Sequence, residues 1–128
     1  EVIFYPTAIG WHPAEKDLLG DEQRGAWMTV QRGHAVANGC YIAAANRVGH
    51  ERPLADSHNA QGAGIEFWGT SFVAGPAGDL VAQAPTDEET ILLAQVDPQR
   101  MEDVRRGWPF LRDRRIDAYQ ALTKRFDD

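Results

Sequence analysis

The sequence has little cysteine, no long apolar run and few basic side chains. Its single cysteine, Cys40, excludes a disulfide within the chain and fits the reducing cytoplasm. No apolar run approaches the roughly 18 residues of a membrane-spanning helix, so we expect no membrane partner. Thirteen Lys and Arg against nineteen Asp and Glu give a net charge of −6, which argues against binding to nucleic acid or to an anionic membrane surface.

The 128 residues, 43% of them hydrophobic, are enough for one domain with a modest core. A strand is predicted at the very start of the sequence, because residues 2–5 are apolar and β-prone and Pro6 follows them. Such a run normally lies inside a sheet and is preceded by other segments. We therefore expect the chain to be the C-terminal portion of a longer protein.

The first half of the chain has the pattern of a strand–helix–strand unit. Residues 2–5 and 40–45 are continuously apolar, as expected of buried strands. Residues 7–20 contain Gly and Pro at intervals, and we expect a loop there. A helix is predicted from Asp21, a suitable N-cap, to the Asn38-Gly39 stop.

The second half of the chain predicts antiparallel strands and a short helix. An exposed loop is expected over residues 49–64, followed by strands at 67–74, 80–84 and 90–96. Asp97 and Pro98 have the pattern of an N-cap and first residue of a helix that ends at Gly107. The element order is that of an α/β protein with a mixed sheet, in which one parallel crossover precedes antiparallel strands.

Two side chains are candidates for catalysis by residue type. Cys40 could be a nucleophile, but it opens an apolar strand beside the negative end of a helix, which favours a buried and inert thiol. His34 lies on the apolar face of the predicted helix, with no identifiable carboxylate partner. We interpret it as a core or interface histidine rather than a general base.

Two clusters are candidates for binding. One holds residue types that ligate metals, but its spacing matches no zinc pattern, and a solvated loop explains it better: His50, Glu51, Asp56 and His58. The other is basic, at residues 105–108 and 112–115, and Asp113 and Asp117 interrupt it. Salt bridges in an anchored tail or subunit contact explain this second cluster better than RNA does.

The loop at residues 6–12 is a different kind of candidate. It directly follows a strand predicted to be parallel, which is where open α/β sheets place ligand-binding groups. A plain connection between elements would have the same composition. The residues alone leave both interpretations open.

Five segments in this order resemble the C-terminal half of carbon-nitrogen hydrolases of the nitrilase superfamily, with the nearest likeness to the N-carbamoylputrescine amidases and their bacterial relatives. They are VIFYPTAIG at 2–10, QRGHAVANG at 31–39, ANRVG at 45–49, FWGTSFVAGP at 67–76 and GWPFLRDRR at 107–115. The resemblance implies an α-β-β-α sandwich with a mixed sheet. Residues 1–128 would form a partial domain whose N-terminal half is missing, with 108–128 as its C-terminal tail.

The resemblance also implies a chemistry without metal or organic cofactor. Family members use a Glu–Lys–Cys triad to attack an amide, carbamoyl or nitrile carbon, and a thioester forms before water releases the acid. In the family pattern all three residues precede the first strand of this chain. We therefore expect no catalytic residue here, and Cys40 does not match the nucleophile.

What the resemblance assigns to this half is part of the substrate-binding pocket. Thr7, Ala8 and Ile9 would lie near the bound substrate, an amide or N-carbamoyl amine. Trp11 and His12 would line the mouth, where the best-known N-carbamoylputrescine amidases carry Ser-Glu. The family also implies a homo-oligomer that uses the helix at 21–38 and the tail.

Three functions stay open from the sequence. The first is the C-terminal part of a cytoplasmic amidohydrolase whose nucleophile lies upstream. The second is a non-catalytic truncated subunit or interaction module. The third is a self-sufficient cysteine hydrolase that uses Cys40.

Overall fold

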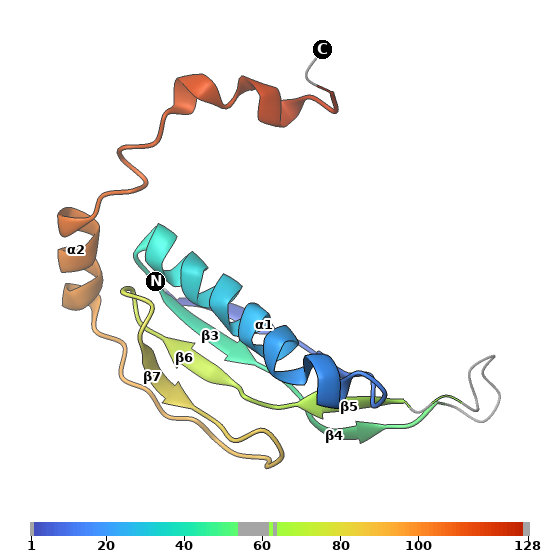
Figure 1. Cartoon of the computed structure of the whole chain (residues 1–128). Coiled ribbons are helices and arrows are strands. Elements are labelled where there is room, and N and C mark those ends of the chain that lie inside the picture. The colour runs from blue at the N-terminus through green and yellow to red at the C-terminus, as the bar shows by residue number, and fades with distance from the viewer. Residues whose placement is uncertain (1, 54–61, 63, 127–128) are drawn as a thin grey trace.

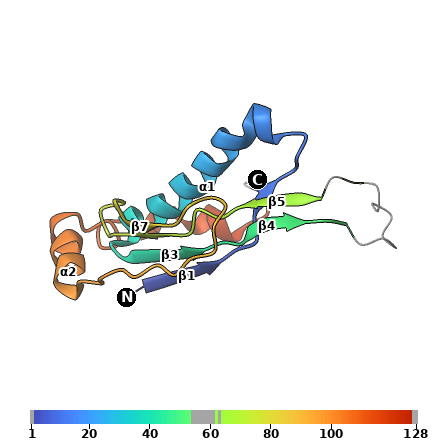
Figure 2. The same ribbon diagram turned by 90° about the horizontal axis from the view of Figure 1, so that it is seen from below.

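The two apolar runs of the first half lie side by side as parallel strands in the computed structural model, which describes residues 2–53, 62 and 64–126 (Figures 1 and 2). The strands of the described chain are β1 (Val2–Pro6), β2 (Gly10–Trp11), β3 (Tyr41–Ala45), β4 (Val48–Glu51), β5 (Ile65–Trp68), β6 (Phe72–Ala74) and β7 (Leu80–Gln83). The helices are α1 (Lys16–Asn38), α2 (Pro98–Gly107) and two 3₁₀ turns, Ile116–Ala118 and Gln120–Thr123.

The main sheet has the order β1-β3-β6-β7. β1 and β3 are parallel, whereas β3, β6 and β7 pair antiparallel, so the predicted mixed sheet is confirmed. α1 connects β1 to β3 and lies against one face of this sheet (Figures 1 and 2). Among the described residues no helix is long and apolar enough to cross a membrane.

A second, three-stranded sheet has the order β2-β5-β4 and corrects the predicted loop at 49–64. β4 forms because its backbone pairs antiparallel with β5, with His50 opposite Glu66. This strand could not be predicted from the sequence, because it is an edge strand with mostly exposed residues and lacks the apolar pattern of a buried strand. Residues 54–61 and 63 of the predicted loop lie outside the described residues.

The helix start predicted at Asp21 is wrong, because α1 begins at Lys16. Gly20, which in the sequence has the character of a helix breaker, lies inside α1. The indole of Trp11 packs there, with its Nε1 donating to the Gly20 carbonyl over 2.9 Å. A Cβ at Gly20 would lie 3.2 Å from that nitrogen, closer than most real contacts allow.

The single strand predicted at 67–74 is also wrong, because two left-handed residues divide it. Gly69 has φ 48° and Thr70 has φ 54°, and the chain passes there from β5 in one sheet to β6 in the other. Thr70 is held in this unfavourable region by its hydroxyl, which donates to the Trp68 carbonyl, and by its N–H, which donates to the Pro85 carbonyl.

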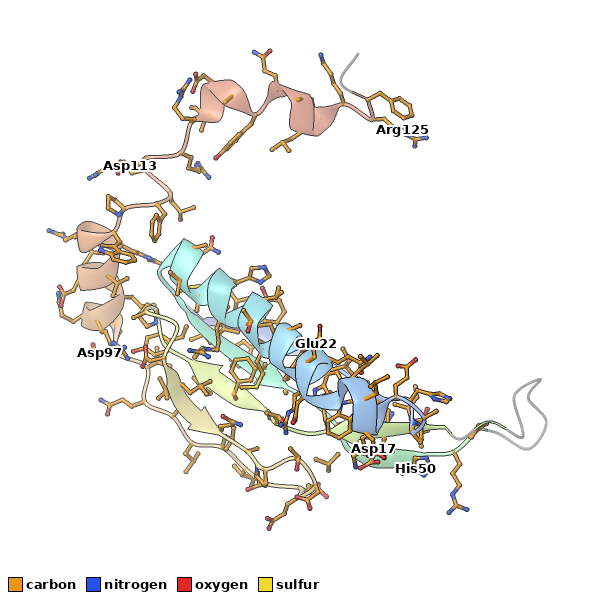
Figure 3. The ribbon with its side chains drawn as sticks, in the orientation of Figure 1. Asp17, Glu22, His50, Asp97, Asp113 and Arg125 are labelled. Atoms are coloured by element: carbon orange, nitrogen blue, oxygen red, sulfur yellow. The ribbon has the colours of Figure 1, made fainter. Side chains whose placement is uncertain are left out.

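Two predicted helix ends are confirmed. Gly39 is left-handed at φ 53°, and the N–H of Cys40 donates to the Ala35 carbonyl, as in a Schellman stop. Asp97 caps α2 by accepting a hydrogen bond from the N–H of Gln99 over 2.9 Å, with Pro98 in the first turn (Figure 3).

The core lies between α1, the main sheet and α2. Its buried members are Ala35, Cys40, Tyr41, Ile42, Ala44, Phe72, Ala74 and Met101. An aromatic cluster extends it towards the second sheet, where the Trp27 ring meets those of Trp68 and Phe72 at 6.0 and 5.5 Å between centroids.

The strand predicted at 90–96 does not form, although the segment keeps an alternating pattern. Leu92 and Ala94 line a cleft with Val2 and Phe4, whereas Ile91 is 87% exposed. The segment has no strand partner in the described part of the chain. The amphipathic tail is likewise exposed as two 3₁₀ turns that extend away from the sheet (Figure 1).

Candidate functional site

The candidate loop at 6–12 begins at the carboxyl end of β1 and joins the two sheets. The Thr7 N–H donates to the Ala45 carbonyl over 2.8 Å, which continues the β1–β3 pairing by one residue. Gly10 and Trp11 then pair with β5 of the second sheet. Both ends of the loop are therefore fixed by strands.

Asn46, directly after β3, holds the middle of this loop. Its Oδ1 accepts from the Ile9 N–H at 3.0 Å and lies 3.1 Å from the Thr7 hydroxyl. Its Nδ2 donates to the carbonyls of Ile9 and Gly69, each at 3.0 Å. The Asn46 amide thus ties the loop to the left-handed turn between β5 and β6.

Trp11 faces the interior, and its indole N–H is already engaged with Gly20. Its ring packs 5.4 Å from that of Trp68, and the Lys16 ammonium lies 5.0 Å from the ring centroid. Lys16 in turn forms an ion pair with Glu66 over 2.6 Å. Trp11 therefore fixes the loop to α1 and β5 through its buried indole.

His12 is exposed, and its Nδ1 accepts from the Ala14 N–H over 3.3 Å. Ala8 is exposed as well. Neither side chain contributes to the cleft that Thr7, Ile9 and Gly10 line.

That cleft, of about 730 Å³, lies between the loop, β1 and α1. Its walls are mainly apolar and aromatic: Tyr5, Thr7, Ile9, Gly10, Glu15, Gln23, Ala26, Trp27, Val30, Gln31 and Trp68. Of the five residues predicted from the sequence, Thr7 and Ile9 come together here, and Ala8, Trp11 and His12 do not.

Two polar side chains stand out in the cleft. The Glu15 carboxylate accepts from Gln23 Nε2 over 3.2 Å and remains exposed. Gln31 is buried, and its Oε1 has no hydrogen-bond partner among the described residues. Among the described residues that line the cleft, Glu15 is the charged one, and none is cationic.

The two candidates for catalysis, Cys40 and His34, do not line this cleft. Cys40 is 2% exposed in the core, as expected of a structural thiol. His34 is exposed, and its Nδ1 lies 2.9 Å from the Tyr5 hydroxyl, so it is a surface histidine rather than a core one.

The predicted metal-type cluster is only partly described, since Asp56 and His58 lie outside the described residues. Elsewhere in the described chain no three His, Cys, Asp or Glu residues are grouped to hold a metal.

The basic cluster of the tail forms ion pairs, as predicted from the interrupting aspartates. Arg112 pairs with Asp113, and Arg115 pairs with Asp117. The hydrogen bond from Arg115 lowers the pKa of the Asp117 carboxyl. Asp113 and Arg125 lie on the tail, apart from the sheet and α1 (Figure 3).

Comparison with known proteins places these elements in a family, since residues 22–106 match the carbon-nitrogen hydrolases. The chain belongs to the carbon-nitrogen hydrolase family. This match covers most of α1, both sheets beyond β1 and β2, and nearly all of α2.

Individual family members are similar over almost the whole chain. The N-carbamoylputrescine amidase of Solanum tuberosum is 44% identical over 122 residues, which are 95% of this chain and 39% of that protein. The citrullinase of Francisella tularensis is 32% identical over 98% of this chain and 41% of its own length. The chain therefore spans about two fifths of these relatives.

A solved structure supports the fold. The carbon-nitrogen hydrolase of Helicobacter pylori G27 superposes with a TM-score of 0.88 at 47% identity, over 98% of this chain and 41% of that one. The predicted nitrilase-type α/β fold is confirmed by this likeness.

Sequence reasoning missed Asn46 as a site residue. The sequence holds only a weak signal for Asn46, which opens the Asn-Arg-Val-Gly stretch that carries part of the family resemblance. A lone Asn after a strand has no distinctive pattern, and only the fold brings it within reach of Ile9 and Gly69.

Proposed function

We propose that this chain is the C-terminal part of an amidohydrolase that cleaves a non-peptide C–N bond, with N-carbamoylputrescine or a related N-carbamoyl amine or linear amide as substrate. The observation that carries the proposal is the 44% identity to the Solanum tuberosum N-carbamoylputrescine amidase over 95% of the chain. The Francisella tularensis citrullinase supports the wider class, because citrulline also carries a carbamoyl group on nitrogen.

In this proposal residues 1–128 supply the substrate-binding wall and not the nucleophile. A cysteine thiolate outside these residues attacks the carbamoyl or amide carbon, and the C–N bond breaks as the amine or ammonia leaves with a proton. Water then hydrolyses the resulting thioester and restores the thiol. The buried position of Cys40 supports this assignment, because a nucleophile needs access to its substrate. Thr7, Ala8, Ile9 and His12 lie on the loop that faces the substrate, and Trp11 supports that loop.

We also propose that the whole enzyme works in the cytoplasm as a homo-oligomer. Residues 1–128 hold one cysteine and therefore no disulfide among themselves, which fits a reducing compartment. The tail exposes aromatic and aliphatic side chains, among them Trp108, Leu122 and Phe126, which a subunit contact would cover.

Ammonia release by the full-length protein tests this function. N-carbamoylputrescine, citrulline and a linear ω-amide would be compared at equal concentration, and we expect hydrolysis of at least one N-carbamoyl amine at the highest kcat/KM. Residues 1–128 expressed alone should release none. Absence of hydrolysis of all three compounds by the folded full-length protein would refute the proposal.

A further inference from the structure

We infer that Asn46 is the positioning residue of the substrate-binding loop, an inference that rests on the proposed function. Asn46 does not line the cleft itself. Its side-chain amide instead contacts both the N–H and the carbonyl of Ile9, which does line the cleft. One side chain therefore fixes both polar backbone groups of a single loop residue.

Both the oxygen and the nitrogen of the Asn46 side-chain amide are engaged in hydrogen bonds. Oδ1 accepts from Ile9 and lies within bonding distance of the Thr7 hydroxyl, while the two Nδ2 hydrogens go to the carbonyls of Ile9 and Gly69. No other residue type offers an acceptor and two donors at this reach. Asp has the same shape and lacks the two donors.

Asn46 is itself held in place. Its N–H donates to Ser71 Oγ over 2.9 Å, and the Ser71 hydroxyl lies 3.3 Å from the Asn46 carbonyl. Gly69, the other end of the link, is left-handed, and a Cβ there would lie 2.7 Å from the Thr86 carbonyl. Asn46 thus ties the loop to a turn that is packed too closely to hold a side chain at Gly69.

This arrangement predicts an effect on substrate binding rather than on the chemical step. Ile9 and Thr7 would contact bound substrate, whereas the reacting cysteine lies on another segment. Loss of a contact that acts equally on the bound substrate and the transition state raises KM and leaves kcat unchanged.

The test compares Asn46→Asp with Asn38→Asp in the full-length protein. Asn38 is a matched control, because its amide also donates to a carbonyl, that of His34, but on the far end of α1. For Asn46→Asp we expect KM to rise about tenfold or more and kcat to stay within about threefold, since two hydrogen bonds are lost. Unchanged KM in the folded variant, or an equal rise in Asn38→Asp, would overturn the inference.

Two further measurements keep the inference testable if Asn46→Asp does not fold or the protein hydrolyses none of the substrates. Ser71→Ala removes the group that holds Asn46, and we expect KM to rise by about threefold; an unchanged KM would count against Asn46. Amide hydrogen exchange at Ile9 needs no substrate, and we expect it to be about tenfold faster in Asn46→Ala, which removes the Oδ1 acceptor of the Ile9 N–H, and in Ser71→Ala. Unchanged exchange would refute the positioning role, whereas faster exchange without any hydrolysis would reject the proposed function alone.

Discussion

Gly10 occupies a position where even a methyl group does not fit. A Cβ there would lie 2.2 Å from the Glu66 carbonyl oxygen and 2.7 Å from the Phe67 Cα, both backbone atoms that cannot rotate away. We expect Gly10→Ala to lower the free energy of unfolding by about 1–3 kcal/mol, as measured by urea unfolding of the full-length protein.

Gly33→Ala is the matched control for that prediction. Gly33 lies on the exposed side of α1, where a Cβ would extend into open space, at least 4 Å from its neighbours in the described part of the chain. Because Ala is the better helix former, we expect stability to stay equal or to rise by about 0.5–1 kcal/mol. Equal losses of unfolding free energy in Gly10→Ala and Gly33→Ala would show that the close contact of Gly10 with Glu66 and Phe67 does not determine stability.

Asp79 gives a pH-dependent contribution to stability. The guanidinium of Arg100, 2.6 Å away, holds the pKa of this carboxyl below its usual range. A lowered folded-state pKa stabilises the fold above the unfolded-state pKa, and this stabilisation is lost as pH falls through the folded value. Because both groups are partly exposed, the effect should be small, about 0.5 kcal/mol or less.

Asp79→Asn tests this contribution. By thermal unfolding at pH 7 and pH 2, we expect the variant to be slightly less stable than the wild type at pH 7 and the difference to shrink towards pH 2. A difference that persists unchanged at pH 2 would mean that the ion pair is not its cause.

At the scale of the elements, the two helix starts give the clearest test, because the N-cap predicted for α2 is confirmed and the one predicted for α1 is wrong. Asp97 caps α2, and loss of such a cap costs about 1 kcal/mol. Asp21, the cap predicted for α1, instead lies inside that helix and forms an ion pair with Arg24 on the surface. We expect Asp97→Ala to destabilise the protein by about 1 kcal/mol and Asp21→Ala to be neutral within about 0.5 kcal/mol. Equal losses in thermal unfolding would contradict the observed start of α1.

Elements with a continuous apolar pattern or a distinctive end could be predicted from the sequence. β1, β3 and the Gly39 and Asp97 helix ends are of this kind, because local composition determines them. The errors at Gly20, Gly69-Thr70 and β4 have a shared cause. In each, a distant neighbour such as Trp11 or β5 decides the local conformation.

The site was predictable only in part for the same reason. The loop could be located because it follows a strand, and Thr7 and Ile9 of that loop line the cleft. Their contact with substrate stays a prediction. Asn46 could not be assigned a role, since 37 positions separate it from Ile9 in the chain.

At the scale of the whole molecule, residues 1–128 expose many large apolar side chains. Phe4 is 73% and Leu93 88% exposed, in addition to Ile91. We expect the isolated chain to self-associate in size-exclusion chromatography, and replacement of Phe4, Ile91 and Leu93 by Thr to reduce this association. A monodisperse monomer with a cooperative melting transition would contradict the expectation.

The measurement that tests the central claim most directly is identification of the cysteine that forms the thioester. The full-length protein would be mixed with its substrate, quenched in acid and digested, and the modified peptide would be located by mass spectrometry. We predict a modified cysteine outside residues 1–128 and an unmodified peptide containing Cys40. A substrate-derived adduct on Cys40 would show instead that this chain carries its own nucleophile.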